Sequence, residues 1–198
     1  QDQEKLIKVG EYYISPSMPA AEILQRITSG KTVLHSVTIP EGYRITEIAN
    51  LLEKRNLVDK NIFLQQAKNV ELLEGVPTGS LEGYLFPDTY HFGKRTTEAI
   101  IINKMVETFK ERALKQEFLK RAGDMGFSYH EIITLASLIE KETGKDSERK
   151  QISSVFHNRL KKNMLLQTDP TVIYVINMFD GNIRKRDLKI DSPYNTYL

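Results

Sequence analysis

The sequence predicts an α+β protein, with a small strand-helix-helix module followed by a larger, mixed but mainly helical region. Residues 33–39 are rich in β-branched side chains and end at the turn formed by residues 40–42, which is typical of a strand. Apolar residues then recur at helical spacing over residues 45–52. Asp59 has the position of an N-cap for a second helix that runs to Ala67.

Composition narrows the class of protein. The 198 residues are 40% hydrophobic and 27% charged, as in globular domains. A net charge of +2 is too small to indicate nucleic-acid binding, and residues 184–186 are interpreted as a solvated basic loop. The chain has no cysteine, and its four histidines lack metal-ligand spacing. No apolar run is long enough to predict a membrane span, and the abrupt ends predict a piece of a longer protein.

The first half contains a second, weaker strand-helix pattern. Residues 12–16 are strand-like, a helix is expected over residues 21–27, and Gly30 is its expected C-terminal stop. Residues 75–80 combine glycine, proline and serine, which break both helix and strand. We therefore predict an N-terminal region of residues 1–76 and a second domain of residues 77–198.

Two long helices are predicted in the second half. One starts at Thr96 or Thr97 and places apolar residues on one side: Ile100, Ile101, Met105, Val106 and Phe109. The other starts near Tyr129, because Ser128 and Glu131 have the spacing of a capping box, and it ends at Gly144. Its apolar residues cover most of the circumference, which predicts a core helix.

Glu140 and Glu142 lie in the last turn of that helix, where the helix dipole disfavours negative charge. They fall on opposite flanks, so they do not form a carboxylate pair. Helical periodicity does not decide which of them faces a cavity, and an ion pair with Arg149 or Arg159 explains either equally well. Partial burial raises the pKa of a glutamate, which suits a general acid that protonates a glycosidic oxygen. One glutamate suffices where the sugar supplies its own nucleophile.

Several motifs of the second half resemble, in order and spacing, the YceG-like family of endolytic murein transglycosylases. They are LEGYLFPDTY (81–90), ASLIEKET (136–143), SER (147–149), VFHNRL (155–160), LQTDPTVIY (166–174) and YNTY (194–197). The first-half module resembles the LysM-like region that precedes the catalytic domain in that family. The resemblance therefore implies a LysM-like β-α-α module in residues 1–76 and a catalytic domain in residues 77–198.

By position, the catalytic glutamate of the family falls on Glu140. The implied reaction cleaves the β-1,4 bond between N-acetylmuramic acid and N-acetylglucosamine in nascent glycan strands, forms a 1,6-anhydro end, limits strand length, and needs no metal or cofactor. Candidate substrate contacts are Glu82, Tyr84, Asn158, Gln167, Asp169, Tyr194 and Asn195, with Glu82 also the reserve acid. Structural roles stay open: Asp169 before Pro170 as an N-cap, Asn158 with Arg159 as helix support, the tyrosines as core residues.

The resemblance also implies a location and partners. It places the protein in the bacterial cell envelope, held by a single-pass anchor in the cytoplasmic membrane that lies outside this chain, with the catalytic part on the periplasmic or extracytoplasmic side. Peptidoglycan glycan strands are the expected partner, peptidoglycan synthases are candidates, and nucleic acid is not expected. Family members continue past the YNTY motif with a glycine- and proline-rich segment that completes the catalytic domain, so the resemblance implies a catalytic domain truncated at its C-terminus. Two alternatives remain open: a non-catalytic peptidoglycan-binding scaffold and a lysozyme-type hydrolase.

Overall fold

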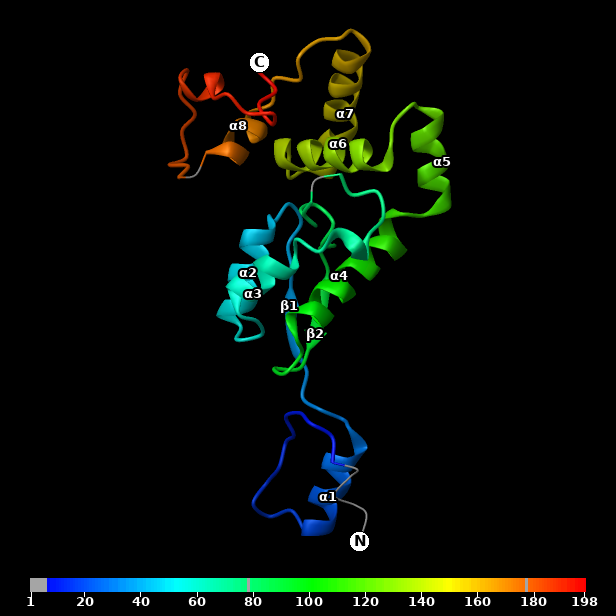
Figure 1. The fold of residues 1–198 in the computed structure, drawn as a ribbon, viewed down its shortest axis with the longest axis vertical. Coiled ribbons are helices and arrows are strands. Elements are labelled where there is room, and N and C mark those ends of the chain that lie inside the picture. Colours follow the sequence, from blue (N-terminus) through cyan, green and yellow to red (C-terminus); the bar gives the residue numbers. More distant parts are fainter. Residues whose placement is uncertain (1–6, 78, 177) are drawn as a thin grey trace. The chain divides into compact units, whose positions relative to one another are not determined.

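The computed structural model describes residues 7–77, 79–176 and 178–198, and the chain forms two compact units, residues 1–118 and 119–198 (Figure 1). The sequence-based division at 76/77 thus falls inside the first unit. Leu81 explains the difference, because its side chain is fully buried and its N–H donates to the Ala67 carbonyl at 2.9 Å. The segment after the glycine-rich stretch therefore packs onto the module before it. Thr78, within that stretch, lies outside the described residues.

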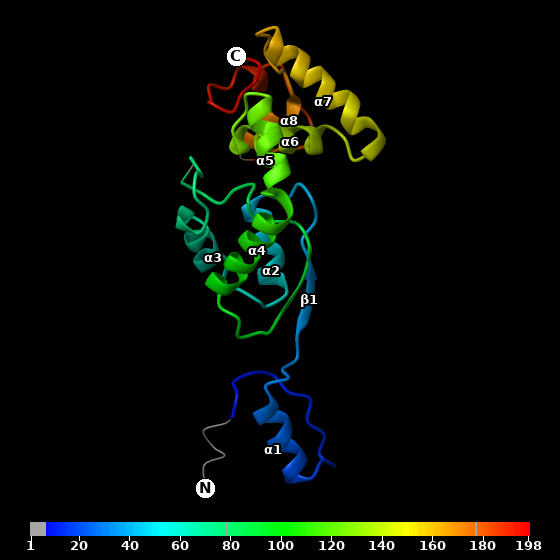
Figure 2. The same ribbon diagram turned by 90° about the vertical axis from the view of Figure 1, so that its right-hand side faces the viewer.

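The first unit contains a two-stranded antiparallel sheet. Strand β1 (His35–Thr38) pairs with β2 (Thr89–Phe92), with Thr38 opposite Thr89. Side chains alternate, so that Val37, Tyr90 and Phe92 are buried while the opposite face is exposed. Helices α2 (Ile45–Lys54), α3 (Lys60–Gln66) and α4 (Glu98–Ala113) lie on one side of β1 (Figure 2). The predicted strand-helix-helix order is confirmed, and β2 completes the sheet.

Local signals set several helix ends where they were predicted. Helix α1 (Ala20–Ser29) ends at Gly30, whose φ of 73° is left-handed and suits glycine. The Asp59 carboxylate accepts hydrogen bonds from the N–H groups of Asn61 and Ile62 at 2.8 and 3.0 Å, and so caps α3. The short 3₁₀ helix η2 (Val70–Leu72) follows α3. These caps depend on neighbours two or three residues away.

Helix α4 starts after Thr97, as predicted, but its buried stripe differs by one residue from the predicted one. Ile101, Met105, Val106 and Phe109 are buried, whereas Ile100 is 57% exposed. Ile102 is buried instead. The stripe is centred between Ile101 and Ile102, which turns Ile100 towards solvent, so its assignment to the apolar side was wrong.

The second unit is built from helices. Helix α5 (Gln116–Asp124) spans the boundary between the units, and α6 (Tyr129–Glu142), α7 (Asp146–Lys161), α8 (Asp169–Val175) and the 3₁₀ helix η3 (Asp187–Lys189) follow. The capping box is confirmed, since the Ser128 hydroxyl accepts from the Glu131 N–H at 3.3 Å and the Glu131 carboxylate accepts from the Ser128 N–H at 2.8 Å. Helix α6 thus begins at the predicted residue.

The prediction that α6 is a core helix was wrong. Among its residues, all of them described, Leu135 is the one that is buried, while Ile132, Ile133, Leu138 and Ile139 are half-buried and Ala136 is exposed. A helix with apolar residues around most of its circumference needs neighbours on every side to bury them. Within its own unit α6 is contacted by α7 and α8, which cover part of its surface. Composition alone does not tell how many neighbours a helix has.

At the level of class, the α+β prediction is confirmed: helices predominate and the sheet has two strands. Across residues 7–77, 79–176 and 178–198, no helix combines the length and the apolar character that crossing a membrane requires.

We expect Asp59→Ala to lower the free energy of unfolding by about 1 kcal/mol, because it removes the acceptor for two N–H groups at the start of α3. Thr97→Ala is the matched control, since Thr97 is the N-cap of α4 and its side chain makes no capping hydrogen bond. Urea unfolding followed by circular dichroism measures both. Equal losses in the two variants would contradict the capping role of Asp59.

Candidate functional site

The last turn of α6 directs its two carboxylates to two different helices. Glu140 Oε2 lies 2.9 Å from Nη2 of Arg149 on α7, and the Glu140 side chain is 28% exposed. The Glu142 carboxylate accepts a hydrogen bond from the hydroxyl of Thr168, the residue before α8. The predicted separation of the two acids is therefore confirmed, and each has its own partner. Of the two partners left open for Glu140, the structure shows Arg149.

Arg149 contacts two carboxylates at once. Its Nη2 is paired with Glu140, and its Nη1 lies 3.1 Å from Asp146 Oδ1 in the first turn of α7. Exposure differs between the partners: the Asp146 side chain is 88% exposed and the Arg149 side chain 35%. Acidic side chains are favoured at a helix N-terminus, which supports Asp146 where it lies. The guanidinium therefore bridges the end of α6 and the start of α7.

The turn between α6 and α7 is held by hydroxyl hydrogen bonds. The buried Thr143 donates its hydroxyl to Glu148 at 2.7 Å and accepts from the Lys145 N–H at 3.0 Å. These bonds fix the reversal of the chain that brings Arg149 to Glu140. Glu148 is also paired with Lys145 at 3.2 Å.

The start of α8 is tied to the segment of residues 195–197. Gln167, with a left-handed φ of 48°, donates its N–H to the Thr196 carbonyl at 3.0 Å. Thr168 is 1% exposed, and its N–H donates to the Thr196 hydroxyl at 3.0 Å. Tyr197 donates its hydroxyl to Asp169 at 2.5 Å, and this hydrogen bond raises the pKa of Tyr197 to about 12. Gln167 and Asp169 are exposed on either side of Thr168, the residue that contacts Glu142.

One detail of the predicted α8 start needs correction. One of the two roles left open for Asp169 was that of an N-cap, with Pro170 at the first helical position. Thr168 is the N-cap instead, so Asp169 and Pro170 are the first and second helical residues. Thr168 makes no side-chain capping bond, and its hydroxyl donates to Glu142.

The other predicted residues of the second unit have different surroundings. Asn195 is 6% exposed, and its Nδ2 donates to the carbonyls of Leu188 and Ile190 at 3.1 and 2.7 Å, so it holds the loop that precedes it. Tyr194 is 52% exposed and meets Tyr174 edge-on, with ring centroids 5.1 Å apart. A buried, fully engaged amide is not open to a glycan, so the structure does not support substrate contact by Asn195.

On α7, Asn158 is exposed, while its neighbour Arg159 donates to the Leu166 carbonyl. Arg159 therefore holds the segment that leads to α8. This contact supports the structural reading of Arg159 that the sequence had left open.

Glu82 and Tyr84 belong to the first unit, where both have structural contacts. The Glu82 oxygens accept the Ile45 N–H at 3.1 and 3.3 Å, which satisfies a donor at the start of α2. Burial raises the pKa of Glu82, against the opposing effects of that hydrogen bond and of the Arg44 charge. Tyr84 is 1% exposed and meets Phe109 edge-on at 5.2 Å between centroids. The core position of Tyr84 does not support contact with a substrate.

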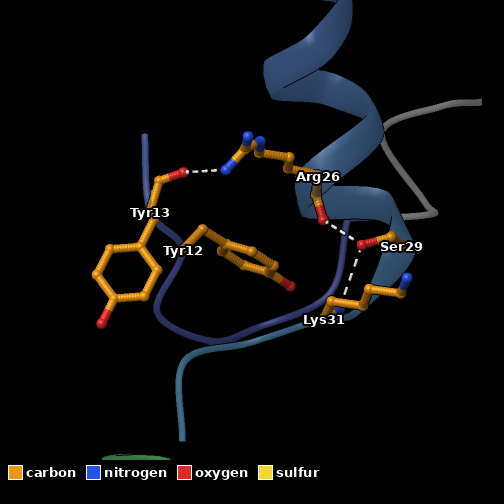
Figure 3. Close-up of a pocket in the computed structure, with 5 residues that line it drawn as sticks. All are labelled: Tyr12, Tyr13, Arg26, Ser29 and Lys31. Atoms are coloured by element: carbon orange, nitrogen blue, oxygen red, sulfur yellow. Dashed lines mark hydrogen bonds between the residues drawn. The ribbon is translucent and has the colours of Figure 1, made fainter. Parts of the chain in front are cut away.

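Two surface hollows of the first unit contain none of the predicted site residues. One, of about 270 Å³, is lined by Tyr12, Tyr13, Arg26, Ser29 and Lys31, with Arg26 donating to the Tyr13 carbonyl at 3.0 Å (Figure 3). The other, of about 540 Å³, lies between the α2–α3 turn and the β2–α4 turn. Within the described ranges, no group of three or more His, Asp or Glu side chains is arranged to hold a metal ion.

The model of the YceG-like family matches residues 1–198, the whole chain. The chain belongs to the YceG-like family. Relatives named endolytic murein transglycosylase include one from Bacillus subtilis, 37% identical over 96% of this chain and 57% of the relative, and one from Streptococcus pneumoniae strain R6, 34% identical over 96% and 40%. The chain thus spans between two fifths and three fifths of the length of these relatives.

A solved structure agrees with this family assignment. The crystal structure of a yceG-like protein from Listeria monocytogenes is similar to the chain, with a TM-score of 0.72 and 33% identity over 99% of this chain and 70% of the other. The similarity extends over both compact units.

Sequence reasoning did not single out Asp146, Thr143 or the hydroxyl of Thr168. The spacing of Asp146 and Arg149 is a recognisable i, i+3 ion-pair pattern at a helix start. The two threonines carry no such signal, because their partners depend on how α6, α7 and α8 pack.

Glu82 gives a pH-dependent prediction. Its folded-state pKa lies above the ordinary 4.5, so the folded protein binds the proton more tightly than the unfolded chain, and the stability associated with this group falls as pH rises from 4.5 through the raised pKa. Glu82→Gln keeps a side-chain oxygen for Ile45 and does not titrate. We expect the unfolding free energy of the wild type, minus that of Glu82→Gln, to decrease across this window in urea unfolding at a series of pH values. A pH-independent difference would contradict the buried, ionisable role.

Proposed function

We propose that the protein is an endolytic peptidoglycan transglycosylase that cleaves the β-1,4 bond between N-acetylmuramic acid and N-acetylglucosamine in nascent glycan strands. The observation that carries the proposal is the match, over 96% of the chain, to relatives named endolytic murein transglycosylase. The matched length includes nearly all of the chain, and the α6–α7–α8 arrangement supplies a carboxyl group suited to the reaction. The activity is proposed for the whole protein, of which these residues supply the acid.

Glu140 is the proposed general acid and base. It lies in the last turn of α6, a helix that begins with a capping box. Its side chain is partly exposed, and its partner Arg149 holds it in place. These properties suit a carboxyl group that must reach a bound sugar and change its protonation state. Glu142 is less suited, because the nearly fully buried Thr168 engages it.

The reaction balances without water. The Glu140 carboxyl group gives its proton to the O4 atom of the departing N-acetylglucosamine as the bond from C1 of N-acetylmuramic acid to that oxygen breaks. The carboxylate then takes the proton of the muramic C6 hydroxyl while O6 bonds to C1. Glu140 is protonated again at the end, and the product carries a 1,6-anhydro ring. The intramolecular hydroxyl replaces the second carboxylate of the usual glycosidase.

Three exposed residues remain proposed glycan contacts. Gln167 and Asp169 lie next to Thr168 and thus beside the end of α6, and Tyr194 offers a half-exposed ring. Amide, carboxylate and aromatic groups suit the hydroxyls and faces of pyranose rings. Asn158, which is exposed on α7, is a fourth proposed glycan contact, supported only by its exposed position.

The remaining assignments follow from the proposed activity. The β1–α2–α3 order supports a LysM-like, glycan-holding module in residues 1–76, and residues 77–198 are proposed as the catalytic domain. Peptidoglycan is the proposed substrate, peptidoglycan synthases are proposed partners, and the location is the cell envelope, with a single-pass anchor in the cytoplasmic membrane and the catalytic part outside the cytoplasm. A non-catalytic scaffold and a lysozyme-type hydrolase are the competing functions, and neither is favoured by a contact in the structure.

We expect Glu140→Gln to reduce the yield of 1,6-anhydro products from peptidoglycan by about 10²-fold or more, since the amide cannot donate or accept the transferred proton. Glu142→Gln is the matched control, because it lies on the same turn and its amide oxygen still accepts from Thr168. Mass spectrometry of the digested strands measures both variants. Hydrolysis would add one water per cleaved bond, seen on the N-acetylmuramic acid end, and a scaffold would cleave nothing.

Anhydro products from Glu140→Gln at the wild-type level would exclude Glu140 as the acid. Products that carry the added water would support the lysozyme-type reaction. A loss of activity in Glu142→Gln as large as in Glu140→Gln would show that the turn, and not the single carboxyl group, is what matters.

A further inference from the structure

The larger surface hollow of the first unit, of about 540 Å³, is lined by side chains of both charges. Glu53 and Asp59 come from the end of α2 and the turn after it, and Lys94, Arg95 and Glu98 come from the turn before α4 and its first residue. We propose that this hollow binds a short peptide with a free amine and a free carboxylate, namely the peptide stem of peptidoglycan. The class of ligand follows from the lining, and the choice of the peptidoglycan stem rests on the proposed function.

Backbone N–H groups hold the three carboxylates of the hollow in place. Glu53 Oε1 accepts from the Lys60 N–H at 3.3 Å. Asp59 Oδ1 accepts from the Asn61 N–H at 2.8 Å. Glu98 Oε1 accepts from the Asp59 N–H at 2.9 Å, and this bond joins the two turns that form the hollow. The lining is therefore ordered before a ligand arrives, which lowers the entropic cost of binding.

Each of these carboxylates keeps one oxygen for a ligand. Across residues 7–77, 79–176 and 178–198, the second oxygen of Glu53, Asp59 and Glu98 has neither a hydrogen-bond nor an ion-pair partner. A carboxylate oxygen is a strong acceptor for an ammonium group, because the charge of both partners strengthens the hydrogen bond. The hollow thus offers acceptors for the amine of a ligand.

The two cations of the hollow differ in their partners. Lys94 Nζ lies 3.1 Å from Oε1 of Glu11, which is not part of the lining. Arg95 is exposed, and no carboxylate in the described part of the chain pairs with it. A guanidinium binds a carboxylate through two parallel N–H bonds. Arg95 is therefore the contact for the carboxylate of the peptide.

The balance of charge disfavours other classes of ligand. The hollow has three carboxylates against two cations, one of them already paired, so a phosphate group or a polyanion is repelled. In the described ranges, no group of three or more acidic or histidine side chains is arranged to hold a metal ion. A peptide stem carries separate charges of both signs, in the amine of its diamino acid and in the carboxylates of its D-glutamate and terminal D-alanine.

Uncharged side chains complete the lining. Asn56 and Thr97 are exposed, and the Thr97 hydroxyl makes no capping bond. Amide and hydroxyl groups suit the N–H and carbonyl groups of a peptide bond, and the half-buried Val58 suits the methyl groups of alanine. A volume of about 540 Å³ lies within the range of small-ligand sites.

The direct test measures binding without catalysis, by ¹⁵N NMR titration of the 198-residue chain. The probe is a synthetic stem peptide with a free lysine side-chain amine, acetylated at its N-terminus to mimic the link to the sugar. We expect its binding to shift the backbone amides of residues 53–59 and 94–98. Acetylation of the lysine amine, or amidation of both carboxyl groups, should raise the Kd about fivefold, since each removes a charge-assisted contact on an exposed surface.

Arg95→Gln locates the carboxylate end of the peptide. We expect it to raise the Kd of the unmodified peptide about fivefold and to leave the Kd of the amidated peptide equal to that of the wild type, because the partner charge is then already absent. Arg112→Gln is the matched control, since Arg112 is exposed on α4 and lies outside the lining of the hollow.

The double variant Glu53→Gln/Glu98→Gln locates the amine end. It keeps the side-chain oxygens that accept from the N–H groups of Lys60 and Asp59, and it leaves the Asp59 cap of α3 unchanged. We expect it to weaken binding of the free-amine peptide and not of the lysine-acetylated one. Glu107→Gln/Glu111→Gln is the control, because both residues are exposed on α4 and outside the hollow.

Three results would overturn the inference. They are a stem peptide that does not bind, amide shifts confined to residues outside the hollow, and a loss of affinity in Arg95→Gln no larger than in Arg112→Gln. A peptide-free glycan that shifts the same amides would assign the hollow to sugars and would also overturn it. Changes in the probe itself do not affect folding, so they test the site even if a variant is unstable.

Anhydro-product formation separates this inference from the proposed function. If anhydro products form in a Glu140-dependent way and the stem peptide does not bind, the inference fails and the proposed function stands. If the peptide binds as expected and no anhydro products form, the peptide site stands and the proposed function fails.

Discussion

The C-terminal turn of a helix repels carboxylates, because the carbonyl groups there carry the negative end of the helix dipole. Helix α6 nevertheless ends with Glu140 and Glu142, and each is stabilised by a donor from another helix. Arg149 joins this turn to α7 and Thr168 joins it to α8. Two contacts that join α6 to its neighbouring helices therefore start from carboxylates at a position that an isolated helix would disfavour.

The two donors differ in a way that matters for chemistry. Thr168 is nearly fully buried and neutral, and its own N–H donates to the Thr196 hydroxyl, whereas Glu142, which it engages, is exposed. Arg149 is charged and one-third exposed, and it has a second carboxylate partner. One acid of the turn thus meets a neutral hydroxyl, while the other meets a guanidinium that also contacts a second carboxylate.

The parts of the fold that could be predicted from sequence depend on neighbours in the chain. Asp59, Ser128 and Gly30 act on backbone groups within about one helical turn, so their residue types and spacing were sufficient. By contrast, Glu142 meets Thr168 26 residues away, and Glu82 meets Ile45 37 residues away. The residues next to each partner in the sequence give no indication of these long-range pairs. The family motifs assigned the catalytic role to Glu140, but its contact with Arg149 became known only from the packing of α6 and α7.

Residue type alone does not determine the role of a buried side chain. Tyr84 and Asn195 have side chains that suit a sugar, yet Tyr84 packs in the core and Asn195 holds a loop through its buried amide.

The β1–β2 register has a consequence for the order of folding. The hydroxyls of Thr38 and Thr89 meet across 51 residues of chain, whereas α2 and α3 are neighbours along it. Closing so long a loop costs conformational entropy before the strand pairing repays it. We therefore expect the helices to form first and the small sheet to close late.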